Sequence, residues 1–266
     1  MTLKSEDIYK DLWTIRQQSP LVHNITNYVV MNTTANALLS LGASPVMAHA
    51  NEEVAEMTGI ASALVINIGT LSPAWISAMF TAAKTAKEKG IPIILDPVGV
   101  GATTLRTDTA RDLIRETAPD IIRGNGSEIM ALSQAGVTTK GVDSTSDSND
   151  ALESARNLNQ AFNSVVCVTG ETDYILDGDN LLQVKNGHAL MPKVTGLGCT
   201  ASAVCGAFAA VNPDRIKAAA HAMAVMGIAG EMAAQDAKGP GTLQLHFLDA
   251  LYNLSEKDIE ARLNVE

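Results

Sequence analysis

The chain has 266 residues and a formal net charge of −10, and 46% of its residues are hydrophobic although only 4% are aromatic. Its acidic balance, without a cluster of Lys and Arg, argues against nucleic acid or an anionic membrane as partner, and no apolar run reaches the roughly 18 residues of a spanning helix. Three cysteines without metal-like spacing, and the lack of a signal peptide, predict a reduced, cytoplasmic protein.

Strand-like and helix-like segments alternate along the chain. The first helix is expected to be capped by Ser5 and to carry Ile8, Leu12 and Ile15 on one face. Such alternation implies right-handed crossovers and a mostly parallel sheet. The expected strands are 21–27, 43–47, 63–67, 91–95, 120–122 and 164–168, and the expected helices are 29–41, one from about 52, 72–89, 108–117, 151–162, 201–210, 213–235 and 247–255.

The second half of the chain adds a hairpin. Residues 174–184 alternate around an Asp-Gly turn and predict an antiparallel appendage to the sheet, and a further strand is expected at 189–194. The segment 137–150 is the most solvated, and no chemistry is assigned to it. The predicted fold is therefore α/β, a single domain over residues 1–266 with a mostly parallel central sheet flanked by helices.

Residues 193–203 form a glycine-rich turn in front of a helix of small residues. Gly196 and Gly198 lie one residue apart, so backbone N–H groups are free at the positive end of the helix dipole, where an anion binds. Glycine has no Cβ to hold a phosphate away. The alternative is a plain strand-to-helix corner, where glycine is also common.

Other polar residues follow expected strands. Asp96 ends one apolar strand, Arg123 and Glu128 flank two glycines at the start of a helix, and Thr169-Gly170 ends another strand. In a parallel sheet these ends share one edge, which brings together a cation that grips phosphate and carboxylates that suit Mg²⁺. Alternatively, Asp96 caps its own turn, and Arg123 and Glu128 form a surface ion pair.

The first strands carry a second group of candidates. Asn24, Thr26 and Asn27 either cap the following turn or face a ligand at a strand end. His23 is interpreted as a core residue, because no second ligand lies at a metal-like spacing. Met47 either fills the core or contacts a flat heteroaromatic ring through its flexible thioether.

An acid, an Arg, a second carboxylate and an anion-binding turn are the groups that phosphoryl transfer requires. The sequence lacks the P-loop pattern G-x-x-x-x-G-K-[ST], and it lacks the protein-kinase combination of a Gly-rich loop with H-R-D. The pattern therefore indicates a phosphotransferase of another class.

Six segments carry a resemblance to one family, in that family's order and over nearly the whole chain. They are His23-Asn24-Ile25-Thr26-Asn27, Gly42-Ala43-Ser44-Pro45-Val46-Met47, Asn67-Ile68-Gly69-Thr70-Leu71, Asp96-Pro97-Val98-Gly99, Arg123-Gly124-Asn125 and Val194-Thr195-Gly196-Leu197-Gly198-Cys199. These segments resemble hydroxyethylthiazole kinase. The resemblance implies a three-layer ribokinase-like fold, a homotrimer with active sites between subunits, and phosphorylation by ATP and Mg²⁺ of the hydroxyl of 4-methyl-5-(2-hydroxyethyl)thiazole in thiamine salvage.

The resemblance also implies roles for individual residues. Met47 and Gly196 would contact the thiazole, and Asn27 would line the thiazole pocket. Arg123 and Thr169 would contact ATP.

Asp96 and Glu128 would support Mg²⁺ and the phosphates, directly or through water. The expected catalytic residues are Gly196, Gly198 and Cys199. Many sugar kinases of the ribokinase superfamily have an Asp as general base where this chain has Cys199. A thiol with a pKa of about 8.5 is a poor base at neutral pH, although a helix N-terminus can lower it, so the role of Cys199 stays open between base and lining residue.

Two alternative functions are consistent with the same residues. The first keeps the fold and changes the chemistry, to a kinase of another small alcohol or pyrimidine or to a nucleotide-dependent dehydratase. The second is a thiazole- or nucleotide-binding protein without turnover. The second would require Asp96, Arg123 or the glycine turn to be missing, and all three are present.

Overall fold

One sheet of eight strands organises the computed structural model, which describes residues 2–133 and 146–266. Its strands are β1 (Leu21–Ile25), β2 (Ser44–Val46), β3 (Ala63–Asn67), β4 (Ile93–Asp96), β5 (Ile121–Asn125), β6 (Val165–Thr169), β7 (Asp173–Asp177) and β8 (Asn180–Val184). They lie in the order β2-β1-β3-β4-β5-β6-β7-β8. All neighbours from β2 to β6 are parallel, whereas β7 and β8 pair antiparallel, which confirms both the mostly parallel sheet and the hairpin.

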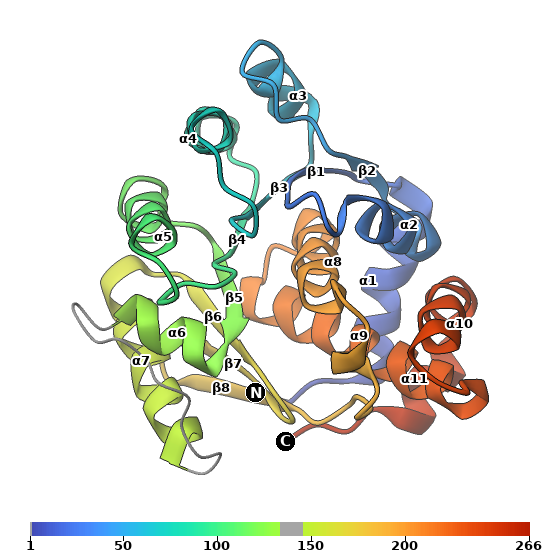
Figure 1. Ribbon diagram of the computed structural model, residues 1–266. Coiled ribbons are helices and arrows are strands. Elements are labelled where there is room, and N and C mark those ends of the chain that lie inside the picture. The colour runs from blue at the N-terminus through green and yellow to red at the C-terminus, as the bar shows by residue number, and fades with distance from the viewer. Residues whose placement is uncertain (1, 134–145) are drawn as a thin grey trace.

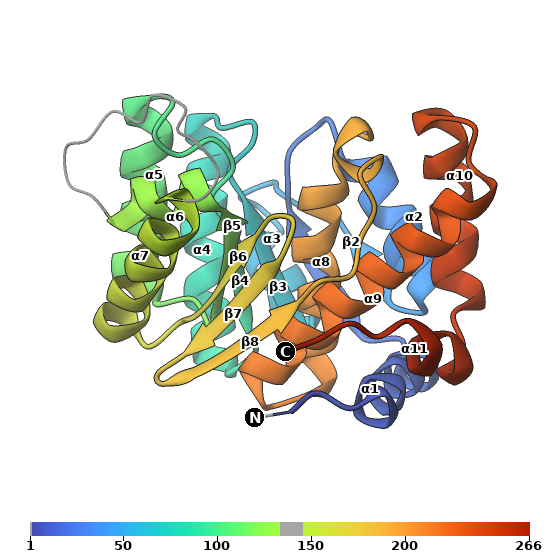
Figure 2. The same cartoon turned by 90° about the horizontal axis from the view of Figure 1, so that it is seen from below.

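Helices cover both faces of this sheet (Figure 1). They are α1 (Ser5–Gln18), α2 (Met31–Leu41), α3 (Val54–Ile60), α4 (Pro73–Lys89), α5 (Thr104–Thr117), α6 (Gly126–Ser133), α7 (Ser146–Phe162), α8 (Leu197–Val211), α9 (Arg215–Asp236), α10 (Pro240–Asn253) and α11 (Glu256–Arg262). One apolar cluster joins the sheet to α1, α2 and α8 to α11, and a second joins it to α3 to α7. The result is the expected three-layer arrangement. Figure 2 shows the β7–β8 hairpin at the sheet edge, with α1 and α11 side by side.

Successive strand residues alternate between these two clusters. In β4, Ile94 belongs to the cluster under α8, whereas Ile93 and Leu95 belong to the opposite one. Side chains alternate across a strand with a period of two, so the parity of a residue decides which layer it faces. Asp96 therefore faces the α8 layer.

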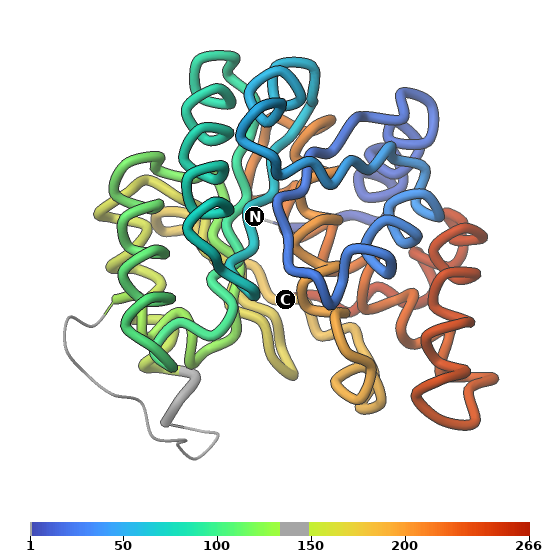
Figure 3. The backbone as a smooth tube through the Cα atoms, turned by 45° about the horizontal axis from the view of Figure 1, so that its top comes forward, coloured from blue at the N-terminus to red at the C-terminus, as the bar shows by residue number. Residues whose placement is uncertain are grey.

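Small residues let α8 approach the sheet closely. A Cβ on Gly206 would lie 2.6 Å from Val65 Cγ2 and 3.1 Å from Val22 Cγ1. The helix packs on β1, β3 and β4, so its N-terminus is held beside the carboxyl ends of these strands. Figure 3 shows the segment before α8 projecting at the same end of the molecule as the loop between α9 and α10.

The strand predicted at 189–194 is wrong. Those residues contain a short 3₁₀ helix, η1 (Met191–Lys193). Pro192 explains the difference, because it has no N–H to give to a ladder and its fixed φ suits the first turn of a helix. The glycine turn thus follows a helical turn rather than a strand end.

Several predicted boundaries also move. Lys4, not Ser5, is the N-cap of α1, and it makes no side-chain cap bond. The helix expected at 247–255 begins at Pro240, a residue whose missing N–H is harmless at the first helical position. The following helix α11, which was not predicted, begins with a capping box between Ser255 and Asp258.

Three elements, α5, β5 and α7, are longer than their predicted ranges. The helix expected from 108 begins at Thr104 behind a Thr103 cap, and β5 continues through Asn125, so Arg123 lies inside a strand. Of the solvated segment 137–150, residues 137–145 lie outside the described residues, and α7 begins at Ser146 rather than at 151. Within 2–133 and 146–266, none of the helices has the length and apolar character needed to cross a membrane.

Candidate active site

Four polar residues lie at or near the carboxyl ends of adjacent strands and share the face that α8 covers. They are Asn67, Asp96 and Thr169, the last residues of β3, β4 and β6, and Arg123, two residues before the end of β5. The register places Asn67 opposite Asp96, and Arg123 opposite the core residue Cys167. The alternation of side chains along each strand thus gathers them at one edge of the sheet.

A chain of hydrogen bonds links the glycine turn to Asp96. Asn27 Nδ2 lies 3.3 Å from Cys199 Sγ and donates to Asn67 Oδ1 at 2.9 Å. Asn67 Nδ2 donates to Asp96 Oδ2 at 2.8 Å, and Ser202 Oγ donates to the same oxygen at 2.8 Å. Three predicted site residues, Asn27, Asp96 and Cys199, are therefore brought together through two that were not predicted.

The carboxyl group of Asp96 is almost completely buried. It is 1% exposed, and burial raises its pKa to about 7, with Glu128 adding to the rise. Arg123 and the hydrogen bonds from Ser202 and Asn67 oppose this shift. The alternative that Asp96 only caps its own turn does not fit, because its side-chain partners come from β3 and α8.

Arg123 lies over the glycine turn. Its Nη2 donates to Thr169 Oγ1 at 2.7 Å, so the two predicted ATP residues are in contact. A Cβ on Gly198 would lie 3.2 Å from Arg123 Nη1. The buried Nε has no hydrogen-bond partner within the described residues. Burial lowers the pKa of Arg123, but Asp96 and other acidic groups raise it by more, so a positive charge with a spare donor stands beside the turn.

Glu128 binds backbone rather than Arg123. Its Oε1 accepts from Gly99 N at 2.9 Å, and its Oε2 accepts from Asn125 N at 2.9 Å. No ion pair between Arg123 and Glu128 exists in the described part of the chain, which contradicts the surface-pair alternative. Glu128 joins the loop after β4 to the loop after β5.

The glycine turn has the geometry that only glycine gives. Gly196 is the N-cap of α8 with φ 87°, and a Cβ there would lie 2.7 Å from Val30 Cγ1. Gly196 has no side chain that could accept a capping hydrogen bond, so the first N–H groups of α8 lack the usual side-chain acceptor. Arg123 Nη1 lies beside Gly198 in this first turn, so free N–H groups and a positive charge are close together, which suits an anion.

Cys199, in the first turn of α8, differs from the expectation. A helix N-terminus lowers a thiol pKa, but burial raises the pKa of Cys199, and Asp96 raises it further. The donors Asn67 and Asn27 only partly oppose this rise. Burial wins, so the thiol is protonated at neutral pH.

Asp173 is a residue that the sequence did not reveal. Its Oδ1 accepts from Gly170 N at 3.0 Å and so closes the loop that carries Thr169. Burial raises its pKa to about 6, against the opposing effects of the Gly170 N–H and of Arg123. It stands at the start of β7, three residues after Gly170, in the tight turn that joins β6 to β7.

The predicted thiazole side of the site lies around β1 and β2. His23 is a core residue as predicted, with Nδ1 2.9 Å from Thr58 Oγ1 and Nε2 2.7 Å from Ala48 O. Burial lowers its pKa, although its contact with the Ala48 carbonyl opposes the shift. Met47 is half-buried directly after β2.

Three rings that sequence reasoning missed gather close to Met47. His49 and Trp75 have centroids 4.4 Å apart, and Tyr28 lies 4.7 Å from Trp75. His49 Nδ1 also lies 3.4 Å from the backbone oxygen of Met47. The rings come from three separate segments, so no local pattern announces them.

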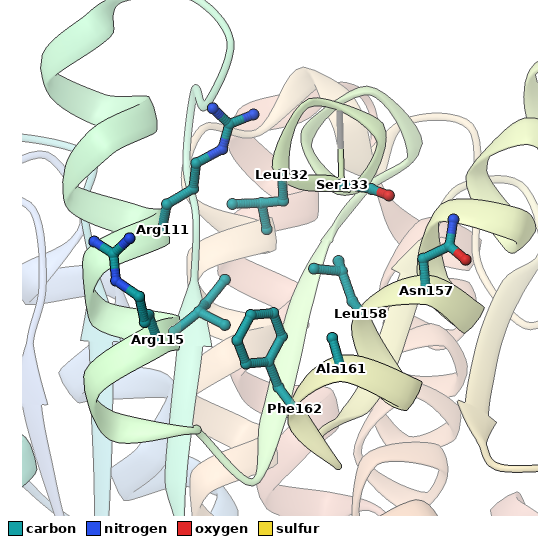
Figure 4. A pocket seen from close by; sticks show the side chains of 9 residues that line it. Arg111, Arg115, Leu132, Ser133, Asn157, Leu158, Ala161 and Phe162 are labelled. Carbon is teal, nitrogen blue, oxygen red and sulfur yellow. The ribbon is translucent and has the colours of Figure 1, made fainter. Parts of the chain in front are cut away.

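An apolar cavity on the outer layer lies away from these residues (Figure 4). It has a volume of about 360 Å³ and lies between α5, α6 and α7. None of the predicted site residues lines it; its lining is Arg111, Ile114, Arg115, Leu132, Ser133, Asn157, Leu158, Ala161 and Phe162. The site is therefore assigned from polar geometry and not from this cavity.

The three-layer arrangement, with a mostly parallel sheet between two layers of helices, is that of the ribokinase-like class. Solved structures agree on the fold. A ribokinase-like superfamily protein of Enterococcus faecalis has a TM-score of 0.67 at 13% identity and covers 96% of both chains. A pyridoxal kinase of Staphylococcus aureus, in complex with AMP-PCP and pyridoxal, has a TM-score of 0.64 at 15% identity over 93% of this chain and 98% of that one.

Comparison at higher identity gives the family. The model of the hydroxyethylthiazole kinase family matches residues 12–257. Hydroxyethylthiazole kinase of Syntrophus aciditrophicus is 61% identical over all of this chain and 98% of its own length. The structure of a hydroxyethylthiazole kinase protein from Pyrococcus horikoshii has a TM-score of 0.90 at 44% identity and covers 98% of both chains. The chain belongs to the hydroxyethylthiazole kinase family.

Proposed function

We propose that this chain transfers a phosphoryl group from ATP to the hydroxyl of 4-methyl-5-(2-hydroxyethyl)thiazole, in thiamine salvage. One observation carries the proposal: Arg123, with its unpartnered Nε, lies over Gly198 at the N-terminus of α8, one residue from Cys199 and its link to Asp96. A phosphate site and a polar, partly dry site for an alcohol thus share one turn. This supports a single kinase domain over residues 1–266.

The residues around the turn divide the work of phosphoryl transfer. Arg123, Thr169 and the N–H groups that follow Gly196 would hold the phosphates of ATP, because their donors converge on one place. Met47, Asn27 and Gly196 would form the thiazole side. The transition state of such transfers is loose, so positioning and charge stabilisation contribute more than proton removal.

The carboxylates fit Mg²⁺. Asp96 receives both of its hydrogen bonds on Oδ2, so its Oδ1 has no donor among the described residues, and Glu128 has spare lone pairs on both oxygens. Mg²⁺ takes one or two carboxylates and keeps several waters beside substrate phosphates. Asp96 and Glu128 would hold the ion, directly or through water, and the ion would neutralise phosphate charge.

The test is a kinase assay with matched alcohols. The wild-type chain is incubated with ATP, Mg²⁺ and either hydroxyethylthiazole or a hydroxymethylpyrimidine, and products are identified by mass spectrometry. We expect the thiazole phosphate and stoichiometric ADP. Phosphorylation of the pyrimidine alone would favour the other small-alcohol kinase, whereas binding of both ligands without any product would favour the binding protein.

Arg123→Lys is expected to raise KM for ATP or lower kcat by about 10-fold or more. Lysine keeps the charge but loses the planar fork that reaches Thr169 and the phosphates together. Steady-state kinetics with varied ATP measure the effect. Arg115→Lys on α5, whose side chain is 68% exposed, is the control and keeps wild-type kinetics. Unchanged ATP kinetics in Arg123→Lys would remove this residue from the ATP site.

Cys199→Asp is expected to remain active and to equal or exceed the wild type. Burial at this position raises the pKa of either group, but a carboxyl starts about 5 units below a thiol, so Asp would be the more ionised base at neutral pH. Turnover is compared for Cys199→Asp and Cys199→Ser, with Cys205→Ser on the same helix as control. Loss of activity in both Cys199 variants, together with a trapped phosphocysteine, would establish the thiol as a nucleophile instead.

A homotrimer with sites at subunit interfaces is part of the proposal. Beside Asn27, the side chains of Tyr28 and Val29 are 65% and 64% exposed, and a neighbouring subunit would cover this apolar surface. Sedimentation of the active enzyme should give about three times 27.9 kDa. A fully active species of 27.9 kDa alone would contradict shared sites.

A further inference from the structure

Asn67 occupies the centre of the site without any role assigned to it so far. It is the last residue of β3, is 1% exposed, and lies opposite Asp96 in the parallel register. Its side chain stands between the residues proposed for the alcohol and the carboxylate proposed for Mg²⁺. No other described side chain contacts both Asn27 and Asp96 by hydrogen bonds.

Both ends of the Asn67 amide are used. Its Nδ2 donates to Asp96 Oδ2 at 2.8 Å. Its Oδ1 accepts from Asn27 Nδ2 at 2.9 Å and from Gly69 N at 2.9 Å. A flipped amide would set its oxygen against the Asp96 carboxylate and its NH₂ against two donors, so the network allows one orientation.

The orientation of Asn67 then fixes that of Asn27. Because Asn67 offers Asn27 an acceptor, the NH₂ of Asn27 points toward Asn67 and Cys199, and its Oδ1 accepts from Val29 N at 3.1 Å. A Cβ on Gly69 would lie 2.7 Å from Asn27 Nδ2, so the glycine leaves the space that this amide occupies. Asp96 thus fixes the orientation of the Asn67 amide, and Asn67 in turn fixes that of Asn27.

We propose that Asn67 is a positioning residue that couples the two halves of the site. By binding Asp96 on Oδ2 it holds the other oxygen, Oδ1, available to the Mg²⁺ and phosphate side, and by accepting from Asn27 it holds a donor against Cys199. This inference rests on the proposed function, because it concerns how the thiazole alcohol and MgATP are aligned. Misplacement by about 1 Å of aligned reactants costs roughly 100-fold in rate.

The test compares Asn67→Asp and Asn67→Ala with the wild type in the thiazole kinase assay. Asn67→Asp is nearly isosteric, but it replaces the donor to Asp96 by an oxygen and sets two carboxyls side by side. We expect kcat to fall by about 100-fold in Asn67→Asp and by about 10-fold or more in Asn67→Ala. KM for ATP should stay within about 3-fold in both, because none of the hydrogen bonds of Asn67 in the described part of the chain reaches Arg123 or Thr169.

Asn24→Ala is the matched control. Asn24 is also an asparagine near the end of a strand and 1% exposed, but its amide donates only to Val22 O, and its Oδ1 has no partner in the described residues. It should match Asn67→Ala in any loss of thermal stability and keep kcat within about 3-fold of the wild type. Equal losses of kcat in the two Ala variants would show a merely structural role for Asn67 and overturn the inference.

A double-mutant cycle with Asn27→Ala gives a second readout. If Asn67 acts through Asn27, the doubly substituted chain should lose little more kcat than the worse single variant. Additive losses, or a kcat of Asn67→Asp equal to that of an active wild type, would overturn the inference and leave the proposed function standing. A wild-type chain that phosphorylates no alcohol would overturn both.

Discussion

Asp96→Asn should lower kcat by about 1,000-fold while the protein stays folded. The amide oxygen of the new residue still accepts from Ser202 and Asn67, so the contacts that hold position 96 persist. What disappears is the negative charge proposed to support Mg²⁺ and the phosphates. Steady-state kinetics measure the loss, and Asp179→Asn, in the exposed turn of the β7–β8 hairpin, is the control. Activity within 10-fold of the wild type would remove Asp96 from the mechanism.

The same substitution changes stability with a defined sign. Without Mg²⁺ or nucleotide, burial raises the pKa of Asp96 from 3.8 to about 7, so the folded chain keeps a proton that the unfolded chain loses in this window. The stability of the wild type therefore falls from about pH 4 to pH 7 relative to Asp96→Asn, by up to about 4 kcal/mol. Urea denaturation of both proteins across this range measures the difference. A difference that is flat with pH would show that Asp96 is ionised in the folded chain.

Gly198→Val should lower turnover by about 100-fold or more. A Cβ here would lie 3.2 Å from Arg123 Nη1, and the branched side chain of Val adds bulk beside the guanidinium, where we propose that a phosphate binds. The φ of Gly198 is not left-handed, so the loss reflects lost space at the site rather than backbone strain. Gly198→Ala should be intermediate, because Arg123 can give by a few tenths of an ångström.

Gly241→Val near the start of α10 is the matched control for Gly198→Val. A Cβ at Gly241 meets nothing within 4 Å, so the same change of residue should leave kinetics unaltered. Circular dichroism and thermal unfolding establish that both variants are folded. A folded Gly198→Val chain with wild-type turnover would show that the turn does not hold the transferring phosphoryl group.

Local sequence patterns predict most of the fold. The apolar runs of β3 and β4 are fully buried between two helical layers, and they predict inner parallel strands without any tertiary information. Local caps were equally informative, since Ser72 accepts from Trp75 N and Gly90 ends α4 in the left-handed region. Local errors came where one residue outweighed its neighbours, as Pro192 did in the expected strand at 189–194.

Only part of the candidate site could be predicted from the sequence. Asp96 and Arg123 stood out because charge at the end of an apolar strand is a local signal, and alternation along β3 would have placed Asn67 on the same face. Ser202 lies three residues after Cys199 on α8, a spacing that puts both on one side of a helix. Nothing in sequence, however, showed that it would donate to Asp96.

The direction of the Cys199 pKa shift was decided by tertiary structure alone. Position at a helix N-terminus is visible in sequence and favours the thiolate, whereas burial beside Asp96 is not visible and disfavours it more strongly. The same holds for Asp173, which lies in a local turn but whose pKa is raised by burial that the sequence does not show. Periodicity and capping depend on near neighbours in the chain, and so the sequence determined the elements and their faces. Desolvation and hydrogen bonding between distant segments depend on packing, and so only the folded structure decided the state of the site.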